Sequence, residues 1–196
     1  MERDAIFRAA LRLINDGKFQ AVSLAEVGYY ANLSERTTRY FFESKERLIE
    51  ELCVEVLNMI QEVYDQSAVD CRSFENFFFD TWISLYEFYV RHPQLIAFVE
   101  QAGVLTTKHR VKFMDRLLTP LKKFFQADAI NLGNKLSSGP MVALFHGNIM
   151  AAAKLHDNPG LSLQQYELRH ILQILWTGVT MRPAMDKDET LLRIAN

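Results

Sequence analysis

Several features of secreted, membrane and metal-dependent proteins are scarce in this sequence or missing from it. Only two cysteines, Cys53 and Cys71, occur in 196 residues, and their separation fits no metal-binding or redox motif. So few cysteines are typical of a reducing compartment, which predicts a cytoplasmic protein. The charged N-terminal stretch is unlike a signal peptide. Asp80 and Glu87 interrupt the apolar run at 77–90, so we expect no membrane-spanning segment.

Motifs that indicate catalysis are also missing. The sequence has no glycine-rich phosphate loop, no His-Glu-x-x-His motif and no nucleophile elbow. Its five histidines are scattered along the chain and suggest no set of metal ligands. We therefore predict that the protein is not an enzyme and that it uses no metal or cofactor.

Alternation of β-branched and polar residues, which predicts β-strands, is equally absent. Apolar residues instead recur at helical spacing along nearly the whole chain. With 49% hydrophobic and 23% charged residues, the composition is that of an ordinary globular protein. We predict an all-α fold with helices at about 3–16, 24–31, 35–42, 45–66, 74–91, 94–102, 107–126, 140–156, 162–181 and 189–194.

Residues 23–48 predict two short helices joined by a tight turn and followed by the start of a third helix. Ser23 and Glu26 have the spacing of a capping box at the first helix. Asn32 falls at the turn, where it tolerates left-handed backbone angles better than most residues. Ser34 and Ser44 are placed to cap the next two helices.

The second short helix of this unit carries basic and hydroxyl side chains, as expected of a helix that enters the major groove of DNA. Arg36 and Arg39 could each make a bidentate contact to guanine, and Thr37 could contact a thymine methyl group or a phosphate. Tyr40 and Lys45 are candidate phosphate ligands. The predicted DNA-binding residues are Ser34, Arg36, Thr37, Arg39, Tyr40 and Lys45. The alternative is a basic, solvated helix within a helical bundle.

The overall charge gives little support to DNA binding. The net charge is −2, and residues 1–50 hold as many acidic as basic side chains. The position of the basic residues must therefore matter more than their number, with Arg36, Arg39, Lys45 and Arg47 grouped at and after the second short helix. We expect weak non-specific affinity and a specific site read by few contacts.

This region resembles the N-terminal DNA-binding domain of TetR-family transcriptional regulators. The resemblance rests on Gly17, Ser23, Val27-Gly28, Ala31-Asn32-Leu33-Ser34, Thr37, Phe41-Phe42 and Ser44-Lys45-Glu46-Arg47-Leu48. It implies an N-terminal three-helix helix-turn-helix domain, predicted at 1–48, and a larger C-terminal helical domain for effector binding and dimerisation, predicted at 49–196. It also implies a homodimer that binds a palindromic operator in double-stranded DNA.

Three positions depart from the family pattern. Asn32 replaces the usual turn glycine, and both residues accept positive φ. Thr38 replaces a common leucine. Arg39 stands where the family usually has an aromatic residue that contacts the DNA backbone, so the resemblance leaves its role open between a phosphate and a base edge.

Aromatic residues are concentrated in the predicted helix at 74–91, and others farther along the chain could join them. The resemblance implies that a small hydrophobic or amphipathic effector binds in this region. The predicted ligand-binding residues are Phe78, Trp82, Tyr86, His109, Phe113 and Phe145. An aromatic stripe at helical spacing is equally the pattern of a solid core.

Small residues recur every four positions in the predicted helix at 140–156, which lets another helix approach closely. The helix at 162–181 carries an apolar stripe. By resemblance, these two helices pair with their copies in a dimer. The predicted interface residues are Ala143, Gly147, Ala151, Ile171, Leu175 and Val179. Packing within one subunit is the alternative.

Together with these patterns, the resemblance implies a homodimeric, sequence-specific transcriptional regulator, a repressor released by a small hydrophobic effector in the C-terminal domain. One alternative is a DNA-binding regulator of the same fold controlled by a protein partner, with no ligand pocket. Another is an all-α enzyme or interaction module that does not bind DNA.

Overall fold

A computed structural model describes residues 1–18, 21, 23–68, 73–101, 119, 138–156, 158, 160 and 163–180, with the backbone alone at 68, 101, 138–142, 179 and 180. Within these ranges every regular element is an α-helix, which confirms the predicted all-α class. The helices are α1 (Glu2–Asn15), α2 (Leu24–Tyr30), α3 (Glu35–Phe41), α4 (Lys45–Ala68), α5 (Phe74–Arg91), α6 (Pro93–Gln101), α8 (Ser138–His156) and α9 (Gln165–Thr180).

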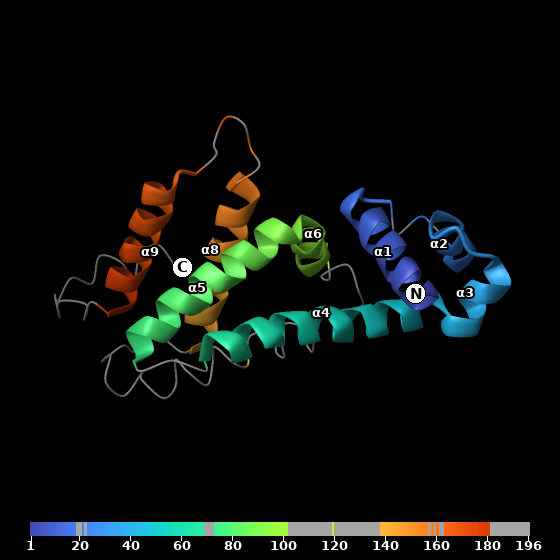
Figure 1. Ribbon diagram of the computed structural model, residues 1–196, viewed down its shortest axis with the longest axis horizontal. Helices are drawn as coiled ribbons and strands as arrows, with labels where there is room; N and C mark the ends of the chain where they lie inside the picture. The colour runs from blue at the N-terminus through green and yellow to red at the C-terminus, as the bar shows by residue number, and fades with distance from the viewer. Residues whose placement is uncertain are drawn as a thin grey trace, which may run out of the picture.

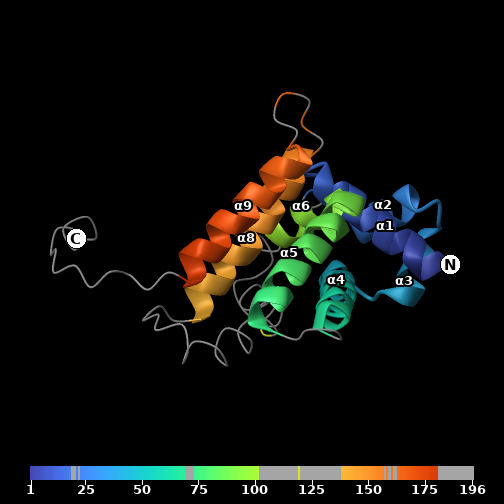
Figure 2. The same ribbon diagram turned by 60° about the vertical axis from the view of Figure 1, so that its left-hand side comes forward.

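The long helix α4 joins two groups of helices (Figure 1). Its first turns follow the compact group α1–α3, and its later part packs against α5. α5 in turn packs against both α8 and α9, as the rotated view also shows (Figure 2). The short helix α6 packs against α1, so the two groups meet there as well as along α4.

The local signals at 17–34 form as predicted. Gly17 has φ 68° after the end of α1, and Asn32 has φ 57° between α2 and α3. The Ser23 hydroxyl accepts from the Glu26 backbone N–H at 3.2 Å, and the Glu26 carboxylate accepts from the Ser23 N–H at 2.7 Å. The Ser34 hydroxyl accepts from the Thr37 N–H at 3.1 Å. These caps satisfy backbone donors that would otherwise lack partners at the helix starts.

The N-terminal group contributes buried apolar side chains to one core that continues into the later helices. Ile6 and Ala10 of α1, Val27 of α2 and Leu48 of α4 are fully buried. Phe42, which directly follows α3, is also fully buried, and its ring centroid lies 5.5 Å from that of Phe7. Burying one large apolar side chain of this kind contributes about 1.5–3 kcal/mol. Phe42 therefore fixes the end of α3 against α1.

The break between the helices predicted at 74–91 and 94–102 is present. α5 ends at Arg91, and α6 begins directly at Pro93. His92 between them has φ −131° and ψ 59°, outside the helical region, as expected for a residue before proline. Proline is well placed at the first position of α6, where its missing N–H has no helical partner to lose.

Some helix boundaries differ from the sequence prediction. α8 begins at Ser138, two residues before the predicted start at Pro140, because proline is tolerated anywhere in the first turn. At α9 the Glu167 carboxylate accepts from the Gln164 N–H at 2.7 Å. Ser162, where the helix at 162–181 was predicted to begin, and the helix predicted at 189–194 lie outside the described residues, as does the helix predicted at 107–126 apart from residue 119. No helix in the described ranges combines the length and apolar character needed to cross a membrane.

Candidate functional site

α3 holds a set of polar side chains on its outer surface. Arg36, Arg39 and Tyr40 are exposed, with Tyr40 at 84%, while Thr37 is half-buried. The Ser34 and Thr37 hydroxyl oxygens lie 2.8 Å apart and form a hydrogen bond with each other. Five of the six predicted DNA-binding residues therefore belong to one short helix and its cap. Lys45 begins the next helix.

The two arginines of α3 differ in their surroundings. The Arg39 Nε donates to the Glu35 carboxylate at 2.8 Å, one helical turn away. Arg36 has no ion-pair partner in the part of the chain that the structure describes. The Glu35–Arg39 pair was not predicted, although the i, i+4 spacing of the two residues is a signal that the sequence contains.

Lys45 lies at the first position of α4. Its side chain is half-buried, and this loss of solvent lowers the pKa of its ammonium group, while nearby Glu46 and Glu26 act to raise it. The Ser44 hydroxyl caps α4 by accepting from the Arg47 N–H at 3.1 Å. Glu46 has a lowered pKa because hydrogen bonds at this cap stabilise its carboxylate.

Arg47, which the sequence places in the same basic group, is held by carboxylates. Its Nη1 lies 3.3 Å from Glu50 and its Nε lies 3.0 Å from Glu51. The Glu51 carboxylate also accepts from Arg3 of α1 at 3.0 Å, and Arg3 lies 4.7 Å from the centre of the Phe7 ring. This network ties α1 to α4. Arg3 and Glu51 are 48 positions apart, so no periodicity could have indicated the contact.

Two further aromatic side chains are exposed near the turn. Tyr29 and Tyr30 end α2 and lie edge to face, with ring centroids 5.9 Å apart. Neither was among the predicted DNA-binding residues. Their position just before the turn at Asn32 is the sequence feature that could have indicated that they lie near α3.

The described members of the predicted ligand-binding set come together in one aromatic cluster. The rings of Phe78 and Phe145 are 4.8 Å apart, and Trp82 stacks on Tyr86 at 5.5 Å and 11°. All four side chains are buried. His109 and Phe113 lie outside the described residues.

Hydrogen bonds connect this aromatic cluster to α8. The Trp82 Nε1 donates to Asn148 at 3.1 Å, and the Tyr86 hydroxyl lies 2.8 Å from His156 Nδ1. The Phe78 ring also lies 5.2 Å from that of Trp176 in α9. The cluster therefore joins α5 to both α8 and α9.

A buried polar pair lies beside the aromatic cluster. The Tyr89 hydroxyl and His146 Nε2 are 2.9 Å apart, and both residues are almost completely buried. Burial lowers the pKa of His146 to about 4. Among the described residues, the buried hydroxyls of Tyr64 and Thr81 have no hydrogen-bond partner.

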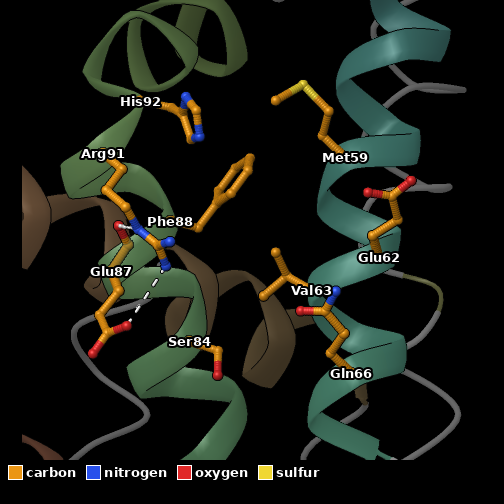
Figure 3. A pocket seen from close by; sticks show the side chains of 9 residues that line it. All are labelled: Met59, Glu62, Val63, Gln66, Ser84, Glu87, Phe88, Arg91 and His92. Atoms are coloured by element: carbon orange, nitrogen blue, oxygen red, sulfur yellow. Dashed lines mark hydrogen bonds and ion pairs between the residues drawn. The ribbon is translucent and has the colours of Figure 1, made fainter.

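A cleft of about 430 Å³ lies between α4 and α5. Figure 3 shows Met59 and Val63 of α4 and Phe88 of α5 pointing into it. Its polar lining includes an ion pair between Glu87 and Arg91, whose atoms are 3.6 Å apart. The cleft is lined by Met59, Glu62, Val63, Gln66, Ser84, Glu87, Phe88, Arg91 and His92, none of which was a predicted ligand-binding residue.

The predicted dimer residues lie on two different kinds of surface. Ala143 and Ala151 of α8 are exposed, and Gly147 is partly exposed. Ile171 and Leu175 of α9 are half-buried against the protein's own core. Among the described side chains of these helices, the large exposed apolar ones are Leu144, Tyr166 and Ile174. The side chain of Val179 lies outside the described residues.

No group of three or more His, Cys, Asp or Glu side chains in the described ranges could hold a metal ion. The arrangement of α1–α3 is that of a helix-turn-helix unit, with α3 on the outside, followed by a larger helical region. This is the architecture of helix-turn-helix DNA-binding proteins.

Solved bacterial regulators share the fold of about nine tenths of this chain. A TetR-family transcription regulator from Marinobacter aquaeolei VT8 superposes with a TM-score of 0.80 at 17% identity, covering 92% of this chain and 96% of that one. A TetR-family transcriptional regulator from Haemophilus influenzae Rd superposes with a TM-score of 0.73 at 18% identity, covering 89% of this chain and 94% of that one. A fatty acid degradation regulator from Bacillus halodurans superposes with a TM-score of 0.72 at 10% identity, covering 91% of this chain and 94% of that one.

The chain therefore has the TetR-regulator fold, as its sequence resemblance predicted. No family model matches the sequence. No curated protein matches it either.

Proposed function

We propose that the protein is a homodimeric, sequence-specific DNA-binding transcriptional regulator that acts as a repressor. The observation that carries this proposal is the outward position of α3, with Arg36, Arg39 and Tyr40 exposed, on a TetR-type fold. A short helix of this kind enters the major groove, while neighbouring helices contact the phosphates. The acidic balance of the chain fits a site read by few, well-placed contacts rather than by a general basic surface.

A two-fold dimer would place two copies of α3 on successive major grooves, roughly 34 Å or a multiple of it apart. The exposed apolar side chains Leu144 and Ile174, on α8 and α9, support an interface on these helices. Small exposed residues on α8, Ala143 and Ala151, would allow close approach of a partner helix. We therefore propose the interface on the outer faces of α8 and α9.

Regulation would act through a population shift between dimer geometries that match the operator and geometries that do not. We propose that a small hydrophobic or amphipathic effector in the C-terminal region favours the second geometry. α4 is one connection from that region to α3, and the contact of α6 with α1 is another. The apolar side chains in the cleft between α4 and α5 support an effector that acts directly on α4.

The proposal is tested by selection of binding sites from a random pool of duplex DNA with the full-length protein. We expect a palindromic consensus, dimers in solution, and reduced transcription from a reporter promoter that carries the selected site. Failure to enrich any sequence at low salt would reject DNA-binding regulation. Enrichment with increased transcription would reject the repressor role alone.

A specific observation favours a second candidate, control by a protein partner with no ligand pocket. Phe78, Trp82, Tyr86 and Phe145 pack closely against one another and against α8 and α9, as a solid core would. Mass spectrometry of the protein under native conditions separates the two, because a bound small molecule supports the effector. Purification from its source without any bound molecule, and no ligand from a metabolite library that alters operator affinity, would support the protein partner.

A further inference from the structure

α3 carries an ion pair on the surface that would face DNA. The Arg39 Nε donates to the Glu35 carboxylate at 2.8 Å, and the two side chains are 57% and 56% exposed. Exposed i, i+4 pairs contribute little to stability, because water and salt screen them. Stability alone therefore gives little reason for a carboxylate on this surface.

The pair leaves a defined part of the Arg39 guanidinium available. Arginine has five N–H donors in a rigid plane, and Glu35 occupies the one on Nε. The two terminal nitrogens, Nη1 and Nη2, each keep a donor on the end of the side chain. Two parallel donors at this spacing match the O6 and N7 acceptors of guanine in the major groove. Glu35 thus restricts Arg39 to end-on recognition.

A docked α3 would strengthen this restriction. Glu35 would be repelled by DNA phosphates and would lose solvent, both of which are unfavourable for an isolated carboxylate. The interaction with Arg39 offsets this loss, and it becomes stronger where water is displaced. Docking would therefore favour the arrangement in which the guanidinium stays attached to Glu35.

We propose that Glu35 is a positioning residue that holds Arg39 for bidentate recognition of one guanine in each half-site. The inference rests on the proposed function, because it requires α3 to enter the major groove. Glu35 then has two separable effects. It weakens binding to all DNA through repulsion, and it sharpens the preference at one base pair.

The test uses the full-length protein and its variants Glu35→Gln, Arg39→Ala and Glu43→Gln. Glu43 is an exposed carboxylate just after α3 that has no ion-pair partner among the described residues, so it is a matched control for charge. Site selection from random duplex DNA identifies the consensus of each protein. Fluorescence anisotropy at fixed salt then compares the wild-type site, the same site with one guanine pair changed, and an unrelated duplex.

We expect Glu35→Gln to bind the unrelated duplex more tightly and to lose about fivefold to tenfold of its preference for one guanine. Arg39→Ala should lose the preference at the same base pair, and adding Glu35→Gln to it should change that preference no further. Glu43→Gln should also bind the unrelated duplex more tightly but keep the full guanine preference. Glu35→Asp, which keeps the charge but has a shorter side chain, should lose the preference without the gain in non-specific binding.

The outcomes separate this inference from the proposed function. A wild-type protein that selects no sequence rejects the function itself. If the wild type selects a site and Glu35→Gln or Glu35→Asp retains the full preference at every guanine, the positioning role of Glu35 is wrong and the DNA-binding function stands. The positioning role would also be rejected if Glu35→Gln lost its preference at a base pair where Arg39→Ala keeps the wild-type preference. Far-ultraviolet circular dichroism confirms that each variant used in the comparison is folded.

Discussion

Gly28 of α2 and Thr38 of α3 lie so close together that the two helices have no room for another side chain between them. A Cβ atom on Gly28 would be 2.0 Å from Thr38 Oγ1 and 3.0 Å from Thr38 Cβ. Thr38 is fully buried and donates its hydroxyl to the Ser34 carbonyl at 3.0 Å. The hydrogen bond satisfies the hydroxyl of this buried threonine, which stands where the resemblance expects leucine. The Gly28–Thr38 contact sets how far α3 stands out from α2.

We predict that Gly28→Ala destabilises the protein by about 1–3 kcal/mol, the usual cost of adding an atom to a closely packed core. Operator binding should weaken as well, because α3 must shift. Chemical denaturation monitored by circular dichroism measures the first effect, and fluorescence anisotropy with operator DNA measures the second.

Two comparisons make the Gly28 prediction specific. A Cβ atom added to Gly178 in α9 would meet no atom within 4 Å, so Gly178→Ala should be neutral or stabilising by about 0.5–1 kcal/mol. The double variant Gly28→Ala with Thr38→Ala should be less destabilised than the sum of the single changes, because the clashing hydroxyl is gone. An additive double variant would show that the Gly28–Thr38 contact is not the cause.

The turn between the two helices allows a test of backbone strain. Asn32 has φ 57°, a conformation that glycine adopts without strain and β-branched residues avoid. We expect Asn32→Gly to change the free energy of unfolding by only a few tenths of a kcal/mol and Asn32→Val to reduce it by about 1–2 kcal/mol. Thermal denaturation of both variants checks the order. Equal stability of the two would contradict the left-handed turn.

The buried histidine of α8 predicts a loss of stability in acid. Burial lowers the pKa of His146 to about 4, below the ordinary value of 6.5, so the unfolded chain binds a proton more readily than the folded one. The contribution of the neutral His146 is therefore fully present above pH 6.5 and is lost as the pH falls towards 4. The total loss should be about 3 kcal/mol.

Unfolding by urea at several pH values measures this dependence. His146→Gln can keep a hydrogen bond to Tyr89 but does not titrate, so its stability should change less than that of the wild type between pH 6.5 and about pH 4. His170 is an exposed histidine on α9 and provides the control. If His170→Gln alters the profile as much as His146→Gln, the acid sensitivity does not come from burial.

Arg36 and Lys45 should affect DNA binding in different ways. Arg36 is exposed on α3, where we propose that it contacts a base edge, so Arg36→Ala should relax the preference at one position by roughly 1–3 kcal/mol. Lys45 is half-buried at the start of α4, where we propose that it contacts a phosphate. Lys45→Ala should weaken binding to all sequences about equally and reduce the slope of log K against log salt by about one. Titrations at several salt concentrations distinguish the two patterns.

Local features of this chain could be predicted because they depend on neighbouring residues. The Ser23–Glu26 capping box, the left-handed Asn32 and the break before Pro93 each follow from preferences of one or two residues. The position of α6 against α1 could not be predicted, since it depends on how the two groups of helices are arranged.

Side-chain partners far apart in the sequence were beyond prediction for the same reason. Helical spacing placed His146 on α8, but only the packing of α5 against α8 brings it to Tyr89. Arg47 was assigned to a basic group, whereas the fold brings Arg3 and Glu51 together beside it. Sequence identifies which side chains are available, and packing decides which charges are neutralised.

The outer face of α9 gives the last prediction, which concerns the dimer. Ile174 is 60% exposed and lies on a helix from which Ile171, Leu172 and Leu175 pack against the core. We propose that a second subunit covers Ile174 together with the exposed Leu144 of α8. We expect the wild type to sediment as a dimer and Ile174→Glu to sediment as a monomer at micromolar concentration, because a two-fold interface would bring the introduced charges into an apolar contact.

The control for the dimer prediction is Ile83→Glu on α5, since Ile83 is also exposed, at 44%, but lies outside the proposed interface. It should remain a dimer. Ile174→Glu should also lose affinity for a palindromic operator while binding an isolated half-site like the wild type, because its α3 surface is unchanged. A dimeric Ile174→Glu protein would place the interface elsewhere. A monomeric variant with full operator affinity would show that dimerisation is not what positions the two copies of α3.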